Sequence, residues 1–160
     1  MPYYYDYYHS PRGRMLLVAD DTALTGVYFT GQKYQPRIEK GWVRDTRHGL
    51  LRRTKRELAE YFDGTRTRFT VKIAPRSTPF QRTVWEAIAG VAFGKTITYA
   101  ELARRAGRPG SARAAGGATG RNPISIIVPC HRIVGSSGAL TGYAGGLTKK
   151  RALLALEEHS

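Results

Sequence analysis

Residues 126–134 read Ile-Ile-Val-Pro-Cys-His-Arg-Ile-Val and hold the only cysteine of the 160-residue sequence. An apolar run leads into Cys130, and a Gly/Ser-rich loop follows it. A thiol beside an imidazole is a candidate nucleophile, because the attacking thiolate forms more readily near a base. Cysteine is also among the residues most often buried, so a small residue of the core is the more common interpretation of a lone cysteine. The rest of the sequence has to decide between these two interpretations.

Composition and charge restrict the class of protein. The sequence is 41% hydrophobic, and no apolar stretch approaches the ~20 residues that a membrane span needs. The N-terminus lacks the basic-then-apolar layout of a signal peptide. One cysteine cannot form an intramolecular disulfide or a multi-thiol zinc site, so we expect a cytoplasmic protein without a metal site. The formal net charge of +14 attracts polyanions and favours nucleic acid as a partner, with a generally basic protein or an anionic-membrane binder as the alternatives.

The first thirty residues predict a sheet. Residues 15–19 and 24–29 are apolar runs separated by Asp20-Asp21, a pattern that favours a hairpin. Tyrosines crowd residues 3–8, and aromatic side chains suit the half-buried surface of a strand. These tyrosines could instead stack on bases, but a further strand is the better interpretation.

A polar loop at residues 31–41 precedes a predicted helix at residues 46–62. Basic residues crowd one face of this helix at 52–56. They would form either a solvated surface or, less commonly, a contact with phosphate. Alternating apolar residues at 69–73 predict a closing strand. The other helix face carries apolar residues at helical spacing, namely Leu51, Leu58 and Phe62.

The sequence changes character at residues 74–77, Ala-Pro-Arg-Ser, which predict a linker between a domain of residues 1–74 and a domain of residues 75–160. Thr78, followed by a proline and by Gln81, is a strong helix start. Further on, residues 124–128 predict a short buried or extended segment, and residues 148–158 a last helix.

Two short helices, at residues 98–106 and 111–118 around a Gly/Pro turn, give the outline of a helix-turn-helix unit. The second helix is unusual, because Gly116 and Gly117 each cost ~1 kcal/mol relative to alanine. A helix that reads the major groove would carry long polar side chains. Small residues instead allow close approach to another surface, or tight packing in a core, and Arg113 projects from this bare helix.

These residues together resemble the O6-alkylguanine-DNA alkyltransferases, also called methylated-DNA–protein-cysteine methyltransferases. The resemblance covers residues 78–158 and extends more weakly to the N-terminal part. Its matching blocks, in chain order, are Ser10–Gly13, Phe80–Trp85, Phe93–Lys95, Thr98–Ala103, Gly120–Pro123, Pro129–Arg132, Ser137–Gly138 and Tyr143–Leu147.

The resemblance implies an α/β (α+β) fold with two parts. The N-terminal part would be a ribonuclease-H-like sheet domain, and the C-terminal part a mainly helical winged-helix/helix-turn-helix domain. The implied partner is double-stranded DNA, bound in the minor groove without sequence specificity by a monomer. Cooperative binding along DNA stays open.

The implied activity is DNA repair without a cofactor. The protein would flip O6-methylguanine, and more slowly O4-methylthymine, out of the duplex and move the alkyl group irreversibly to Cys130. The product is a thioether, and neither water nor histidine removes the alkyl group from its sulfur at a useful rate. The sequence has no second cysteine that could accept the alkyl group and regenerate the thiol. Each molecule would therefore act once. One alternative is a non-catalytic lesion sensor or helix-turn-helix DNA-binding protein. Another is a cysteine hydrolase, which is disfavoured because no motif in the sequence indicates an oxyanion hole.

The resemblance also assigns roles to individual residues. Adjacent side chains diverge, so a water would bridge the thiol to the histidine of a Cys–water–His–Glu relay. The implied catalytic residues are Cys130, His131, Glu157 and Asn122, the last holding the turn over the site. The implied DNA-binding residues are Tyr99, which crowds a phosphate, Arg113, which fills the gap left by the flipped nucleotide, Arg108 and Ser136. The implied pocket residues are Tyr143, Ile133 and Ala144.

Two departures from the family pattern stand out. Some relatives bind zinc through N-terminal cysteines and histidines, and a sequence with one cysteine predicts no such site. The order Gly120-Arg121 is reversed in some relatives, so the resemblance does not carry a phosphate contact over to Arg121.

Overall fold

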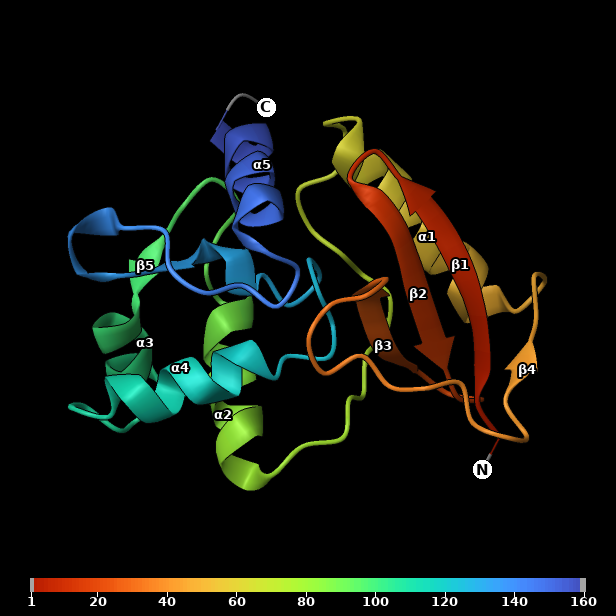
Figure 1. The fold of residues 1–160 in the computed structure, drawn as a ribbon, viewed down its shortest axis with the longest axis horizontal. Coiled ribbons are helices and arrows are strands. Elements are labelled where there is room, and N and C mark those ends of the chain that lie inside the picture. The colour runs from red at the N-terminus through yellow and green to blue at the C-terminus, as the bar shows by residue number, and fades with distance from the viewer. Residues whose placement is uncertain (1, 159–160) are drawn as a thin grey trace.

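The computed structural model describes residues 2–158 and places a sheet with one helix beside a group of helices (Figure 1). The sheet part consists of β1 (Tyr4–Ser10), β2 (Gly13–Ala19), β3 (Leu24–Phe29), β4 (Val43–Arg44) and α1 (Gly49–Phe62). The helical part consists of α2 (Pro79–Ala89), β5 (Ile97–Thr98), α3 (Tyr99–Arg105), α4 (Ala112–Gly120), β6 (Ile133–Val134) and α5 (Leu147–Glu158), with 3-10 turns at Cys130–Arg132 and Ser136–Gly138. The predicted α/β class, with a sheet part and a helical part, is confirmed.

The sheet has the order β3-β2-β1-β4. β2 pairs antiparallel with both β1 and β3, so the predicted hairpin and the predicted tyrosine strand are confirmed. Asp20 makes the hairpin turn, because its carboxylate accepts hydrogen bonds from the backbone of Thr22 and Ala23. β4 is a two-residue strand parallel to β1 that the sequence did not predict.

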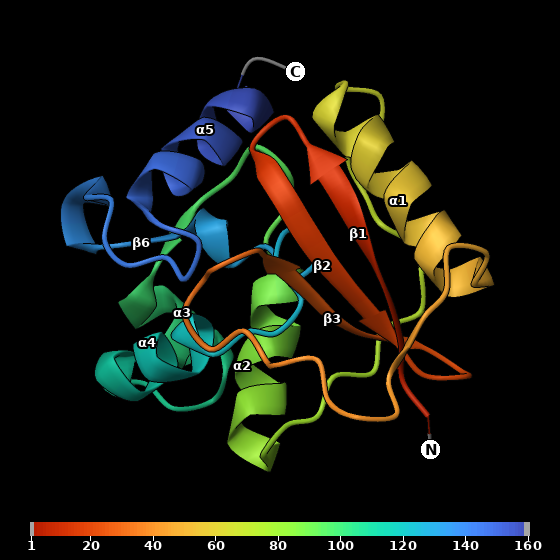
Figure 2. The same ribbon diagram turned by 45° about the vertical axis from the view of Figure 1, so that its right-hand side comes forward.

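Both faces of this sheet are apolar. Met15 and Leu17 point into the main core, toward the face that α1 covers (Figures 1 and 2). Leu16, Val18 and Tyr28 form a second cluster on the opposite face. The alternation of strand side chains explains this division, since neighbours in β2 point to opposite faces. The outward cluster is completed by partly buried aromatic residues, namely Tyr3, Tyr5, Tyr7 and Trp42.

The predicted closing strand at residues 69–73 is wrong. Only Ile73 forms an isolated bridge, to Leu24. The physical reason is Glu57, a fully buried residue of α1 whose carboxylate accepts hydrogen bonds from the backbone N–H groups of Thr70 and Val71. Because a side chain satisfies these donors, the segment does not need a neighbouring strand.

The helical part begins with a complete capping box. The Thr78 hydroxyl accepts from the Gln81 backbone, and the Gln81 side chain accepts from the Thr78 backbone. Thr98 caps α3 by half of such a box: its hydroxyl accepts from the Glu101 backbone, while the Glu101 carboxylate accepts from Arg104 and Arg105. Ser111 precedes α4, and serine is a common capping residue that would predict a side-chain cap. It makes no such hydrogen bond, so this prediction is wrong.

The two halves of the chain meet at a short backbone junction. Val27 of β3 donates to the Pro123 carbonyl and accepts from Ser125. Residues 124–128 bridge to the edge of the sheet at Ile124 and then form a mostly buried turn, in which Val128 donates to the Ile124 carbonyl. The predicted strand or extended segment is therefore wrong beyond Ile124, and the chain runs from this turn to Cys130.

Thr78 should contribute measurably to stability. Thr78→Ala removes one half of the capping box, and we expect a loss of about 1 kcal/mol in the free energy of unfolding. Urea denaturation would measure this loss. Thr67→Ala, at an exposed loop position, is the matched control and should stay within about 0.5 kcal/mol of the parent. Equal losses for the two variants would contradict the capping role.

Candidate active site

Cys130 lies at the start of a 3-10 turn and is 5% exposed. Asn122 shapes the backbone that leads to it. Its side-chain amide donates to the carbonyl of Val128 at 2.8 Å, and its carbonyl accepts from the backbone of Ile124 at 2.9 Å. Ile126, inside this loop, has a φ of 72°, an unusual conformation for a β-branched residue. The buried Asn122 amide thus fastens the loop at both ends.

A buried ionic cluster lies directly behind Cys130. Glu157 of α5 is 4% exposed, and its Oε2 lies 2.6 Å from His131 Nε2. Arg132 donates to both carboxylate oxygens, at 2.8 and 3.0 Å, and to the carbonyl of Val91 at 2.7 Å. The Tyr61 hydroxyl, from α1, donates to the same carboxylate at 2.6 Å. Residues from α1, α5 and the Cys130 turn therefore share one buried charge.

The protonation states in this cluster follow from its contacts. Burial alone would raise the pKa of Glu157, but hydrogen bonds from His131 and Arg132 outweigh it and hold the pKa at about 2. Burial lowers the pKa of His131. An ionised carboxylate can only accept, so a neutral His131 carries its proton on Nε2. Its Nδ1 is then an acceptor, and this buried nitrogen has no hydrogen-bond partner within the described residues.

The thiol itself is protonated in this environment. Burial raises the pKa of Cys130, while a hydrogen bond from Asn122 and the charge of Lys150 act in the opposite direction. Lys150, a fully buried residue of α5, donates to the carbonyls of Ile133 and Thr141 at 2.6 Å each and of Gly142 at 3.2 Å. This lysine therefore joins β6 to the loop that follows it.

A cavity of about 340 Å³ opens onto Cys130. Its walls come from the loop before β4, from α3, from the bare face of α4 and from the loop before α5. The residues that line it are Lys33, Tyr34, Tyr99, Gly116, Gly117, Thr119, Gly120, Cys130, Gly142, Tyr143 and Ala144. Cys130 is the only sulfur-containing residue in this lining, so a group that enters the cavity can meet the thiol.

The structure brings most of the predicted site residues together. Tyr99, Tyr143 and Ala144 line the cavity with Cys130, and His131 and Glu157 lie behind it. Ile133 is buried in β6 and does not line the cavity. The other predicted DNA-binding residues are exposed outside it, namely Arg108 with its guanidinium 5.1 Å from the Phe80 ring, Arg113 on α4 and Ser136 in its 3-10 turn.

Sequence reasoning missed several residues of this site. Tyr61 and Lys150 are ordinary helix positions in the sequence, and only the fold reveals that they are buried against polar groups. Lys33 and Tyr34 lie about one hundred residues before Cys130 in a loop that was predicted only as polar. Arg132 directly follows the Cys-His pair and lies next to an apolar run in the sequence. That position was the only signal from which its burial could have been predicted.

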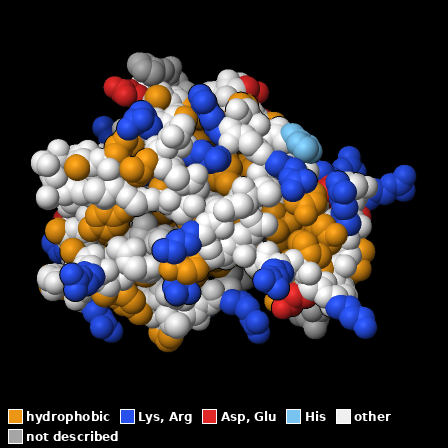
Figure 3. Space-filling view, viewed as in Figure 1, with side chains coloured by type: hydrophobic (Ala, Val, Ile, Leu, Met, Phe, Trp, Pro, Cys, Tyr) orange, Lys and Arg blue, Asp and Glu red, His pale blue; other side chains and the backbone are white. Residues whose placement is uncertain are grey.

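The molecular surface carries many lysine and arginine side chains and few acidic ones on the face shown in Figure 3. Within residues 2–158, no group of three or more His, Cys, Asp or Glu side chains could hold a metal ion. No helix in the same residues is long and apolar enough to cross a membrane.

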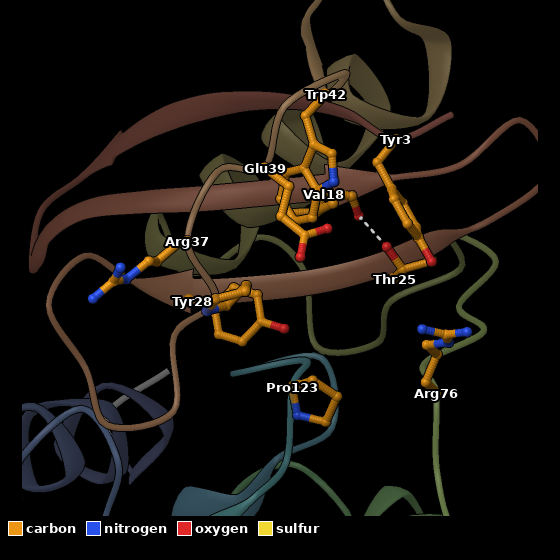
Figure 4. Close-up of a pocket in the computed structure, with 10 residues that line it drawn as sticks. Tyr3, Val18, Thr25, Tyr28, Arg37, Glu39, Trp42, Arg76 and Pro123 are labelled. Atoms are coloured by element: carbon orange, nitrogen blue, oxygen red, sulfur yellow. Dashed lines mark hydrogen bonds between the residues drawn. The ribbon is translucent and has the colours of Figure 1, made fainter. Parts of the chain in front are cut away.

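A second cavity, of about 520 Å³, lies on the outer face of the sheet beneath the loop that precedes β4 (Figure 4). Tyrosine and tryptophan rings form much of its wall, and Arg37, Glu39 and Arg76 stand at its edges. Its lining contains none of the predicted site residues and neither cysteine nor histidine.

The buried carboxylate should make stability depend on pH. The folded-state pKa of Glu157 is below its ordinary value of 4.5, so its stabilisation is complete above about pH 4.5 and is lost as the pH falls toward about 2. The shift corresponds to about 3 kcal/mol in the free energy of unfolding. Denaturant titrations from about pH 5 to about pH 2 would show this loss, and Glu157→Gln should flatten the curve. Glu158→Gln, at the exposed neighbouring position, should leave the slope unchanged, and an equally steep curve for Glu157→Gln would refute the assignment.

Comparisons with known proteins agree with this geometry. The protein-family model for the DNA-binding domain of 6-O-methylguanine DNA methyltransferases matches residues 79–159. The model of the ribonuclease-like domain of the same methyltransferases matches residues 3–75. The two matches together span most of the chain.

Individual relatives are similar over nearly their whole length. A methylated-DNA–protein-cysteine methyltransferase of Methanosarcina acetivorans is 44% identical over 154 residues, which cover 96% of this chain and 97% of the relative. One from Mycolicibacterium paratuberculosis is 44% identical and covers 92% of this chain and 88% of the relative.

Solved structures show the same fold. The crystal structure of the Mycobacterium tuberculosis O6-methylguanine methyltransferase superimposes with a TM-score of 0.89 at 43% identity, over 98% of this chain and 93% of that one. The same organism's protein in complex with DNA gives a TM-score of 0.88 at 41% identity, over 99% and 94%. With its buried Cys-His-Glu arrangement and these full-length matches, the chain belongs to the 6-O-methylguanine DNA methyltransferase family.

Proposed function

We propose that this methylated-DNA–protein-cysteine methyltransferase repairs O6-methylguanine, and more slowly O4-methylthymine, by moving the alkyl group onto Cys130. One observation carries the proposal: the single thiol lines a cavity, and the residue that follows it in the chain belongs to a buried histidine–carboxylate pair. A saturated alkyl carbon needs a soft nucleophile, and thiolate is the one that proteins supply.

The buried cluster supplies the means to form that thiolate. His131 is neutral with a free acceptor at Nδ1, so a bridging water can pass the thiol proton to it. Glu157 then stabilises the imidazolium that results, and Arg132 and Tyr61 keep Glu157 ionised. The sulfur–carbon bond forms as the carbon–oxygen bond to guanine breaks. The departing guanine takes up one proton in place of the one that the thiol lost.

The reaction consumes the protein. Its product is a thioether, a poor leaving group toward water, and the sequence contains no second cysteine that could resolve it. Repair capacity then equals the number of protein molecules. A reducing cytoplasm suits this use of Cys130, because a thiol that is spent once must not be lost to oxidation first.

The DNA is proposed to lie against α4, in the minor groove. Gly117 is exposed on this helix, and the surface around it allows close approach of a phosphodiester backbone. Arg113 projects from the same helix to fill the space left by the flipped nucleotide, with Tyr99 beside the rotated phosphate. Arg108 and Ser136 are proposed to flank the duplex. The extruded base would sit between Tyr143 and Ala144, close to the backbone of Ile133. A monomer presents this surface complete.

Intact mass spectrometry tests the transfer. After incubation with duplex DNA that contains O6-methylguanine, each chain should gain one methyl group and no more. Cys130→Ala should gain none, and excess substrate should leave the yield at one equivalent. Binding to the lesion without any mass change would favour a non-catalytic sensor, and continued turnover would overturn the stoichiometry.

The bare face of α4 can be tested separately. A side chain added at Gly117 meets no atom within 4 Å in the folded chain, so Gly117→Leu should fold normally. It should nevertheless weaken binding to duplex DNA about tenfold or more, because a bulky group prevents close approach to the minor groove. Fluorescence anisotropy would measure the affinity, with Ala59→Leu, on the exposed side of α1, as the control. Unchanged affinity in Gly117→Leu would place the DNA elsewhere.

A further inference from the structure

The loop of residues 30–41 carries a part of the sheet domain to the Cys130 cavity. Lys33 and Tyr34 line that cavity together with Cys130. The backbone of Lys33 donates to the Ala144 carbonyl at 3.3 Å. Gln32 accepts from the backbone of Phe29 at 2.7 Å and from Ser125 at 3.3 Å. The loop is thus fastened both to its own sheet and to the active-site segments.

Tyr34 is held in an unusual conformation at the mouth of the cavity. Its φ is 66°, in the left-handed region that bulky residues seldom adopt, and 48% of it is exposed. Two cations lie over its ring. The Arg121 guanidinium is 4.2 Å from the ring centroid and the Lys33 ammonium is 5.2 Å from it. Strain of this kind persists where surrounding contacts enforce it, often at ligand sites.

A purely structural explanation covers only a part of this arrangement. Arg121 ends α4, where a cation interacts favourably with the helix dipole. That explains neither the exposed, strained Tyr34 nor the second cation. Within residues 2–158, neither Lys33 nor Arg121 forms an ion pair with a carboxylate. The rim of the cavity therefore carries two unneutralised positive charges and an aromatic face.

We propose that Lys33, Tyr34 and Arg121 form a clamp for the phosphodiester next to the flipped nucleotide. The clamp rests on the proposed function, because a nucleotide rotated into the Cys130 cavity brings its flanking phosphates to the rim. The two cations would hold a phosphate, and the Tyr34 ring would pack against the adjoining sugar. The lesion strand then contacts both parts of the fold, and the sheet part takes a direct share in substrate binding.

The clamp is tested by comparing two substrates, a duplex that contains O6-methylguanine and the free base O6-benzylguanine, which has no phosphate. In Arg121→Ala, the ratio of the duplex rate to the free-base rate should fall about tenfold, because only the duplex loses a phosphate contact. Lys33→Gln and Tyr34→Ala should lower the same ratio. Arg56→Ala, an exposed charge on α1, is the matched control and should keep the parental ratio.

Salt dependence gives a second readout. In a Cys130→Ala background, which blocks transfer, the slope of log affinity for the lesion duplex against log salt should decrease by about 0.9 for each phosphate contact removed. Arg121→Ala and Lys33→Gln should each show this decrease. If Arg121→Ala strongly lowers the melting temperature, its loss of binding could come from unfolding. The test then rests on Lys33→Gln, which lies on the exposed loop.

The outcomes separate the two proposals. If the parental protein takes no alkyl group from either substrate, the proposed function fails. If transfer occurs but the clamp variants keep both the parental rate ratio and the parental salt slope, the clamp alone is refuted. Equal loss of rate on both substrates would also refute it, since that marks a role in cavity shape rather than in phosphate binding.

Discussion

A buried carboxylate needs partners, and Glu157 on α5 draws its side-chain partners from two other segments of the chain. His131 and Arg132 come from the turn that carries the thiol, and Tyr61 comes from α1 in the sheet part. Leaving such a charge unpaired in the interior would cost several kcal/mol. The position of α5, the direction of the histidine ring and the contact between the two parts of the fold therefore depend on the same few hydrogen bonds.

In the proposed reaction, this arrangement separates two tasks that are difficult to combine in one residue. The thiol must stay protonated and protected until a substrate arrives, and burial achieves this by raising its pKa. The base must be ready to accept a proton at neutral pH, and burial achieves this by lowering the pKa of His131. Desolvation raises the pKa of an acid that becomes negative and lowers that of a base that becomes positive, so one dry environment keeps both partners in the neutral forms from which the proposed transfer starts.

Local signals in the sequence predicted local features well. The Thr78 and Gln81 spacing predicted a capping box that the structure contains, and the tyrosine-rich start predicted a strand that pairs with β2. Failures came where a distant side chain decided the outcome. The carboxylate of Glu57 took the backbone donors that a strand at residues 69–73 would have used. Tyr34 reached the cavity by tertiary packing alone, and no spacing in the sequence connects it to Cys130. The Cys-His motif in the sequence predicted the centre of the candidate site. The residues at the mouth of the cavity could be found only from the fold.

The hydrogen bond from Tyr61 to Glu157 has a bearing on how this chain can be divided. The family matches change from one domain to the other between residues 75 and 79, which invites truncation to the half that contains the thiol. A fragment without α1 would keep Cys130, His131 and Glu157 but would remove one of the donors that hold the carboxylate ionised and shielded. The boundary between the two family matches therefore does not separate the residues that hold the Glu157 carboxylate. The isolated helical half would be a different acid–base system from the intact chain.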